Sequence, residues 1–239
     1  QRLFINVEGG NLSIVNAWDI NDSGKIVGFY FQSPSGRHGF IYDLEEKTTT
    51  IFNVPGAQTS AFGNNDSGDI VGSYTIGGVN YGFLYDGLFF TTLIAKQVDD
   101  FILDTSAHDI NNSRVIVGVS PLAFEGTGGF TYSGGVFTPL YGPAGESASP
   151  WGINDSGEIV GCYVDDDSET HGFIKSDAGY TTLDYPGAAF GTCALSINNS
   201  GVVVGVYYVE HAADEHGFIW EEGVFSELDF EGASKSKPT

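Results

Sequence analysis

Short runs in which apolar and polar residues alternate recur along the whole chain. In Lys25-Ile-Val-Gly-Phe-Tyr-Phe31, for example, successive side chains fall on opposite sides of an extended strand. Runs of about four to seven residues, bounded every ~8–12 positions by Gly, Asn, Asp, Ser or Pro, are typical of all-β proteins. We find no convincing helical stretch. The pattern therefore predicts an all-β chain with many tight turns.

The runs belong to a sequence repeat that the chain contains five times. Its most constant stretch is Trp18-Asp-Ile-Asn-Asp-Ser-Gly-Lys-Ile-Val-Gly28, and the final glycine recurs at spacings of 44, 46, 43 and 44 residues. The five copies are residues 18–28, 62–72, 108–118, 151–161 and 195–205. A period of this length indicates an array of small supersecondary units that bury their apolar faces against one another.

Each repeat is expected to form four antiparallel strands. In the first repeat these are residues 15–20, 25–31, 38–42 and 48–54, and Asn21-Asp-Ser-Gly24 is a turn that ends on a glycine with positive φ. Arg114 replaces this glycine in the third repeat, where the left-handed conformation is expected to cost roughly 1 kcal/mol. That repeat also has the longest closing connection and is the least regular.

Four short strands per repeat and five repeats in 239 residues describe a five-bladed β-propeller. Residues 2–7 resemble the strand that closes each repeat, so this strand has six copies. We therefore expect the N-terminal strand to pair with or replace the last strand, residues 224–230, which closes the circle of blades. One domain is expected over residues 1–234, followed by a disordered tail at 235–239.

Three blocks carry a resemblance to a known family: Thr181-Thr-Leu-Asp-Tyr-Pro-Gly-Ala188, Ile153-Asn-Asp-Ser-Gly-Glu-Ile-Val-Gly161 and His171-Gly-Phe-Ile174. They resemble the HAF repeats of exported bacterial proteins, and the resemblance covers essentially the whole chain. It implies a propeller-like extracellular protein, secreted or at the bacterial cell surface. In blade count and size the chain is also similar to the five-bladed lectin tachylectin-2, but it does not match that lectin's repeat sequence. Architecture alone does not transfer function.

Composition narrows the classes of partner. The chain has 31 acidic and 9 basic residues and a net charge of −22, so it lacks the Lys and Arg clusters that nucleic acids require. No apolar run approaches the ~18 residues of a membrane helix, and the sequence begins without the basic and apolar regions of a signal peptide. We expect no nucleic-acid partner and no membrane insertion. Carbohydrates, other neutral extracellular ligands and cations remain, and the oligomeric state is not predicted.

The two cysteines, Cys162 and Cys193, fall in adjacent repeats. A disulfide between neighbouring repeats is expected if the protein is exported, and two free buried thiols are the alternative.

The first candidate site is the residue three positions before the repeated Asn. This position holds Trp18, Phe62, His108, Trp151 and Leu195 in the five repeats. Equivalent positions of a propeller form a circle around its axis, where aromatic faces could stack on sugar rings. Packing between blades is the simpler explanation. The predicted ligand-binding residues are Trp18, Phe62, His108, Trp151, Asp19 and Asp109.

Asp19 and Asp109 are also the only catalytic candidates. They follow the variable position in repeats one and three, where the other repeats have Gly63, Gly152 and Ser196. Hydrolysis of a glycosidic bond requires two carboxylates about 5–10 Å apart. The sequence contains no nucleophile elbow, phosphate loop or zinc-protease motif. The preferred hypothesis is thus an exported carbohydrate-binding module. A glycoside hydrolase or lyase and a self-assembling surface protein are the alternatives.

The acidic loops of repeats four and five are candidate cation sites. Asp165, Asp167, Glu169 and Asp214 could bind Ca²⁺, although solvated acidic loops are the simpler explanation. No other cofactor is expected. The His-Gly-Phe histidines, His38, His171 and His216, are expected to bond neighbouring turns, because a feature copied in several repeats usually has the same structural role in each.

Overall fold

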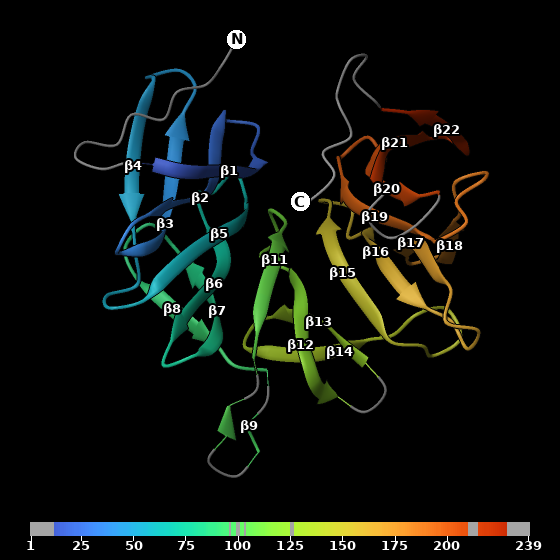
Figure 1. The fold of residues 1–239 in the computed structure, drawn as a ribbon, viewed down its shortest axis with the longest axis horizontal. Helices are drawn as coiled ribbons and strands as arrows, with labels where there is room; N and C mark the ends of the chain where they lie inside the picture. Colours follow the sequence, from blue (N-terminus) through green and yellow to red (C-terminus); the bar gives the residue numbers. More distant parts are fainter. Residues whose placement is uncertain are drawn as a thin grey trace. The chain divides into compact units, whose positions relative to one another are not determined.

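The computed structural model describes residues 12–95, 97–98, 101–102, 104–124, 127–209 and 215–228, and every regular element in these ranges is a β-strand (Figure 1). Among these residues there is no helix of the length and apolarity that a membrane crossing requires. The chain divides into two compact units, Gln1–Ala123 and Phe124–Thr239. Each unit is described by itself.

The predicted fold class is confirmed: the chain is an all-β propeller with five blades of four antiparallel strands. The first unit holds blades 1 and 2 and the first two strands of blade 3. Blade 1 contains β1 (Leu12–Ile20), β2 (Lys25–Gln32), β3 (Gly36–Asp43) and β4 (Thr48–Phe52), and blade 2 contains β5 (Gln58–Asn64), β6 (Ile70–Ile76), β7 (Val79–Tyr85) and β8 (Phe90–Leu93). Blade 3 begins with β11 (Ser106–Ile110) and β12 (Ile116–Phe124).

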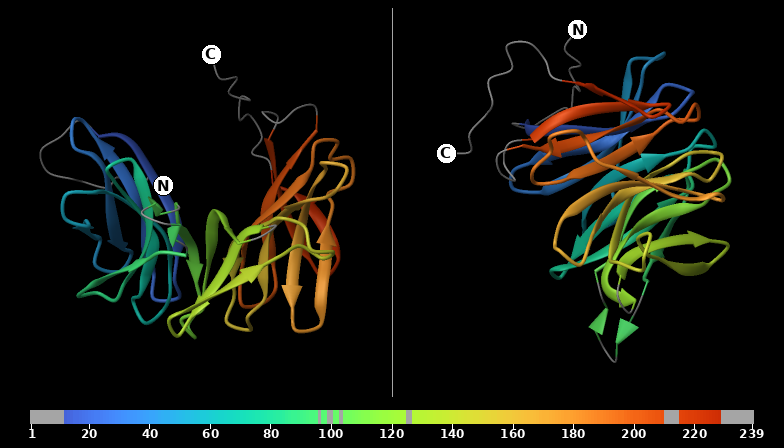
Figure 2. Two further views of the ribbon diagram at one scale, coloured as in Figure 1. Left: turned by 90° about the horizontal axis from the view of Figure 1, so that it is seen from below. Right: turned by 90° about the vertical axis from the view of Figure 1, so that its right-hand side faces the viewer.

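The second unit holds the rest of blade 3 and blades 4 and 5, and Figure 2 shows its sheets from two further directions. Blade 3 ends with β13 (Thr127–Ser133) and β14 (Val136–Leu140). Blade 4 contains β15 (Ala148–Ile153), β16 (Ile159–Val164), β17 (Thr170–Ser176) and β18 (Gly179–Leu183), and blade 5 contains β19 (Thr192–Ile197), β20 (Val203–Tyr208), β21 (Glu215–Glu221) and β22 (Val224–Glu227).

The two predictions about the chain ends are not tested, and the connection before blade 3 differs from its prediction. The proposed pairing of residues 2–7 with 224–230 and the tail at 235–239 involve residues outside the described part, so both stay predictions. The long connection before blade 3 contains a small hairpin that the sequence pattern does not predict, β9 (Gln97–Val98) paired with β10 (Phe101–Ile102). Its strands are too short for a period-2 pattern to be recognised.

The motif phenylalanine of each blade forms the core. All five copies are completely buried: Phe40, Phe83, Phe130, Phe173 and Phe218. The valine before the motif glycine is also completely buried in blades 1 to 4, whereas its blade 5 equivalent, Val204, is 37% exposed. The apolar residues that recur in every repeat are therefore the ones that hold each sheet against its neighbour.

The repeated Asn-Asp-Ser-Gly turn has a second role besides reversing the chain. In blade 1 the Asn21 side-chain oxygen accepts hydrogen bonds from the Ser23 hydroxyl and the Lys25 backbone N–H, as the turn prediction requires. The Asn21 Nδ2 also donates to the backbone oxygen of Asn65, at 2.8 Å, in the turn of blade 2. Equivalent bonds join Asn65 to Asn111 and Asn154 to Asn198. The turns thus connect neighbouring blades within each unit.

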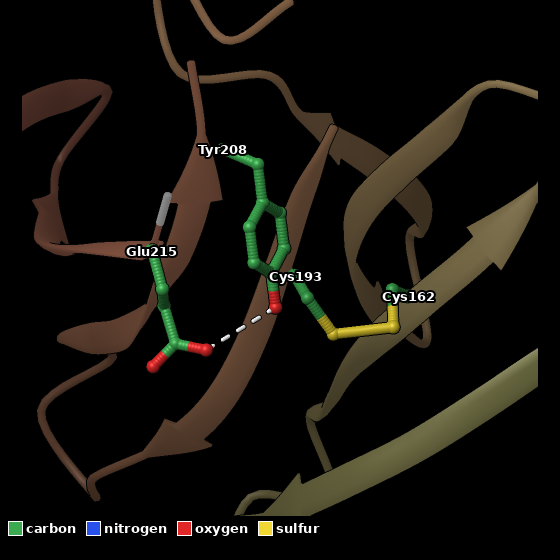
Figure 3. Close-up of a disulfide and its surroundings, with 4 residues drawn as sticks. All are labelled: Cys162, Cys193, Tyr208 and Glu215. Carbon is green, nitrogen blue, oxygen red and sulfur yellow. Dashed lines mark hydrogen bonds between the residues drawn. A yellow bond between two sulfur atoms is a disulfide. The ribbon is translucent and has the colours of Figure 1, made fainter. Parts of the chain in front are cut away.

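A disulfide links blades 4 and 5. Cys162 lies on β16 and Cys193 on β19, with Cα atoms 4.9 Å apart (Figure 3). Of the two alternatives left open by the sequence, the structure contains the disulfide. On the same side of blade 5, the Tyr208 hydroxyl donates to the Glu215 carboxylate at 3.4 Å and joins the end of β20 to the start of β21.

Candidate functional site

The variable position predicted to line the site is a β-bulge in all five blades. The first strand of each blade pairs with the second, and the register shifts by one residue at the equivalent point. A bulge turns the extra side chain away from the regular alternation of the strand, and bulges often lie next to binding sites. The bulged residues are Trp18, Phe62, His108, Trp151 and Leu195.

In the first unit, three of these residues form a row of aromatic rings. The centroids of Trp18 and Phe62 are 5.2 Å apart, and those of Phe62 and His108 are 6.3 Å apart, both in edge-to-face geometry. Phe29 on β2 joins them, 6.5 Å from Trp18 and 6.4 Å from Phe62. The structure therefore brings together three predicted residues from three blades. We call Trp18, Phe29, Phe62 and His108 the aromatic row.

Sequence reasoning missed Phe29, although a signal was present. The equivalent positions of the other blades hold Ser73, Val119, Cys162 and Val206, so an aromatic residue occurs there only beside Trp18. The Arg37 guanidinium lies 5.9 Å from the Phe29 ring centroid, within the range of a cation–π contact. This contact holds a cation against the row in a chain with few basic residues.

Exposure changes along the aromatic row. Trp18 is 51% exposed, Phe62 is half-buried and His108 is only 9% exposed. The inner rings support the indole, and the indole presents an apolar face to solvent. In the second unit, the bulged Trp151 is half-buried and Leu195 is 39% exposed.

The two catalytic candidates lie on either side of one peptide of β5. The backbone N–H of Asn64 donates to Asp19 Oδ2 at 2.8 Å. A Cβ built on Gly63 would lie 2.9 Å from Asp109 Oδ1, so no side chain other than hydrogen fits there. These contacts limit the separation of the two carboxylate oxygens to about 9 Å once ordinary covalent dimensions are added. Because Gly63 of blade 2 has no side chain, Asp109 of blade 3 can lie directly against it.

Asp19 lies in an environment that opposes its charge. Burial raises the pKa of the Asp19 carboxyl above its usual value, and the backbone N–H groups of Asn64 and Ile20 offset this only in part. The Ile20 bond measures 2.8 Å. The site therefore combines two acidic groups with one exposed indole. Asp19 follows Trp18 on β1, and Asp109 comes from β11.

The acidic loop of blade 4 contains a compact group of potential cation ligands. One ligand atom from each of Asp165, Glu169 and His171 lies within 4.8 Å of the others. The backbone N–H groups of Asp167 and Glu169 donate to Asp165 Oδ1, so Asp167 contributes its backbone to this loop. Asp214 lies outside the described residues. The imidazole suits Zn²⁺ better than Ca²⁺, which prefers oxygen ligands.

The His-Gly-Phe histidines share a stacking contact that the sequence does not predict, and two of them also make the predicted bond near a turn. Each packs on the tyrosine directly opposite on the neighbouring strand, with ring centroids 5.1 or 5.2 Å apart, in the pairs Tyr30–His38, Tyr163–His171 and Tyr207–His216. His38 also bonds the Ser35 hydroxyl at 2.8 Å, and His171 bonds Asp184 of the closing turn at the same distance.

These features define a β-propeller whose first three blades contribute the aromatic row and two aspartates, with Trp18 as the exposed ring. Among solved structures, the chain is similar to TolB from Acinetobacter baumannii, with a TM-score of 0.63 and 15% sequence identity over 88% of this chain and 51% of that one. The chain thus spans about half the length of this neighbour, and at such low identity the likeness shows the fold alone. No family model and no curated protein matches the chain. The resemblances to HAF repeats and to tachylectin-2 therefore stay predictions.

Proposed function

We propose that this chain is a carbohydrate-binding module. The observation that carries the proposal is the aromatic row, in which an indole that is 51% exposed rests on Phe29 and Phe62. Aromatic faces stack on the C–H surfaces of sugars, and neighbouring polar groups bond the hydroxyls. Asp19 and Asp109 directly follow Trp18 and His108 in the chain, and their carboxylates lie against Gly63 and Asn64, next to Phe62. The net charge of −22 favours neutral over anionic glycans.

The proposal includes export from the cell. A disulfide between Cys162 and Cys193 supports it, because such bonds form and persist in oxidising compartments and are rare in the cytosol. Expression of the chain in reducing and in oxidising compartments, followed by thiol labelling, tests this part of the proposal. Labelling of both cysteines in the native host would contradict it.

A glycan array followed by titration of the bound polysaccharide tests the binding function. We expect Trp18→Ala to weaken binding roughly tenfold, because the stacking face is lost. Phe89→Ala is the matched control, since Phe89 is an aromatic residue that is 71% exposed and lies on blade 2. Equal binding by wild type and Trp18→Ala would reject the aromatic row. Absence of any glycan ligand, with self-association instead, would support the surface-protein alternative.

A carbohydrate-active enzyme is the second candidate because Asp19 and Asp109 approach each other. Their separation of at most about 9 Å is compatible with the carboxylate spacings that hydrolysis of a glycosidic bond requires. The raised pKa of Asp19 suits a general acid. Product analysis on the bound polysaccharide decides between the candidates. Turnover that both Asp19→Asn and Asp109→Asn abolish would replace the binding function with catalysis.

The binding proposal needs no cofactor, and the Ca²⁺ expectation is tested on blade 4. Melting temperatures are measured after chelation and with millimolar Ca²⁺ or micromolar Zn²⁺. A rise that Asp165→Asn removes would establish a cation site at Asp165, Glu169 and His171. No shift with either ion would leave this group as a solvated acidic loop.

A further inference from the structure

A cavity of about 270 Å³ lies between blades 1 and 2, within the first unit. Its walls come from β2, β3 and β4 of blade 1 and from β5 and β6 of blade 2. Val27, Ile41 and Ile70 form an apolar side, and the Thr48 and Thr50 hydroxyls lie on the exposed edge strand. The cavity is smaller than a drug-sized pocket but large enough for one sugar ring.

One buried residue in this cavity departs from the repeat. The position before the turn is isoleucine in four blades, and in blade 2 it is Asn64. Asn64 is as buried as three of its four counterparts, with 6% exposure against 3%, 5% and 7% for Ile110, Ile153 and Ile197, whereas Ile20 of blade 1 is 54% exposed. Blade 2 therefore has a carboxamide where blades 3 to 5 bury an apolar side chain.

The Asn64 carboxamide has only one of its two ends satisfied by the protein. Its Nδ2 donates to the backbone oxygen of Lys25 at 3.0 Å. Its Oδ1 is fully buried and has no hydrogen-bond partner among the described residues. A buried carbonyl oxygen without a donor is unfavourable, so a small rotation of the carboxamide toward a group that brings a donor into the cavity would be favoured.

The charges around the cavity restrict the chemistry of that group. The Lys25 ammonium pairs with the Asp43 carboxylate, and Glu46 lies on the same rim. Two carboxylates oppose an anion, and the ammonium opposes a cation at the same place. A neutral hydroxyl can donate to Asn64 Oδ1 and also accept from Lys25. Polar groups of this kind beside an apolar wall suit a pyranose, because a pyranose has hydroxyl groups and an apolar C–H face.

We infer that this cavity binds the terminal monosaccharide of a neutral glycan, and that the Asn64 carboxamide turns on binding so that Oδ1 accepts a hydrogen bond from a sugar hydroxyl. The inference rests on the proposed function, because it assigns one sugar unit of the ligand to a defined place. Phe62 of the aromatic row and Asn64 are two residues apart on β5, so one glycan chain can reach both.

The test measures binding of methyl glycosides of glucose, galactose, mannose, fucose and N-acetylglucosamine to the full chain by calorimetry. Asn64→Ile removes the acceptor and restores the residue of the other repeats, and Thr50→Phe fills the cavity from its exposed edge. Thr91→Phe is the matched control, because Thr91 is the equivalent exposed residue on β8 and does not line the cavity.

We expect at least one methyl glycoside to bind wild type and Thr91→Phe, and Asn64→Ile and Thr50→Phe to bind it at least tenfold more weakly. Unchanged binding by both cavity variants would overturn the inference. So would polysaccharide binding by wild type with no binding of any methyl glycoside, and in both cases the carbohydrate function would stand. A wild type that binds no glycan at all would remove the function and the inference together. If Asn64→Ile does not fold, Thr50→Phe decides.

Discussion

The boundary between blades 1 and 2 and the boundary between blades 4 and 5 are built from the same repeat but differ in chemistry. In both, an Asn side chain of one turn bonds the backbone of the next, from Asn21 to Asn65 and from Asn154 to Asn198. The second boundary adds a disulfide and packs Ile197 into an apolar cluster. The first has Asn64 at the same position, beside a cavity and an exposed indole.

The difference distinguishes the residues of the repeat that maintain the fold from those that are candidates for binding. The residues common to all copies hold each boundary together, and they appear in both. The blade 4–5 boundary adds only further cohesion, such as the stacked pair Tyr185–Tyr207 at 3.7 Å. The blade 1–2 boundary also has an apolar cluster, in which Phe52 packs on Phe83 and Tyr85. It differs in that a carboxamide lies beside a cavity and an indole faces solvent. Residues that destabilise a repeat are therefore the first place to look for binding.

The largest expected effect is the loss of the disulfide. Replacing Cys162 and Cys193 by Ser should lower the free energy of unfolding of blades 4 and 5 by about 3–4 kcal/mol, since the bond closes a loop of 31 residues. Urea unfolding in a Trp18→Phe background reports on this region, because the remaining indoles, Trp151 and Trp220, both lie in the second unit. Reductant should destabilise the Cys-containing chain and leave the double variant unchanged. Equal midpoints would show that the boundary does not depend on the bond.

Exchanging the two boundary residues is the next test. Ile197→Asn places a carboxamide in the apolar cluster of blades 4 and 5 and should cost about 2–3 kcal/mol, from lost burial and an unsatisfied polar group. Asn64→Ile should stabilise blades 1 and 2 by about 1 kcal/mol, because relief of the unpartnered oxygen exceeds the lost bond to Lys25. Opposite signs in urea unfolding are the expected result. Destabilisation by Asn64→Ile would mean that Asn64 is needed for folding and not for a ligand.

A smaller effect is expected at Arg114, which has φ 59° where the other motif turns have glycine. Its guanidinium pairs with the buried Asp69 of the preceding blade at 2.7 Å. Arg114→Gly and Arg114→Ala both lose this pair, but only alanine keeps the backbone strain. The glycine variant should therefore be more stable than the alanine variant by about 1 kcal/mol in thermal unfolding. Equal stabilities would show that the turn relaxes without cost.

Arg114 also illustrates how far the sequence predicts the fold. Its backbone conformation follows from alignment with four glycines, because turn geometry is local. The five blades, the turn and the strand order are predicted for the same reason: period and alternation report on contacts that every repeat must make. The partner of its side chain, Asp69, could not be predicted, since it lies 45 residues away and belongs to one boundary only.

The candidate site is predictable only where it coincides with a repeated position. Alignment of the repeats selects Trp18, Phe62 and His108, because they vary at one place in a constant motif, and the structure places them in contact. Phe29 and Asn64 also depart from the repeat, but strand positions vary for many reasons. Only the ring contacts of Phe29 and the unpartnered oxygen of Asn64 separate these two residues from ordinary variation.

The smallest effect concerns His171 of blade 4. Burial lowers the pKa of this imidazole, but hydrogen bonds to Asp184 and Asp165 outweigh it, so the pKa lies above the ordinary 6.5. A raised pKa means that the protonated histidine stabilises the folded state. This contribution is complete below pH 6.5 and disappears as the pH rises through the folded-state value. Asp165 is ionised throughout this range, since hydrogen bonds, chiefly from the Glu169 backbone N–H, keep its pKa below the usual 3.8.

Asp184→Asn should therefore lower the pKa of His171 and flatten the dependence of the melting temperature on pH between 6 and 8. Titration of the imidazole by NMR measures the first effect, and melting curves across the range measure the second. His38 serves as the internal reference, because its counterpart to Asp184 is the uncharged Asn53. An unchanged His171 titration in the variant would show that Asp184 only positions the ring, as Ser35 does for His38. Blade 4 would then match blade 1 at this position, because in each the partner of the histidine would orient the ring without changing its charge.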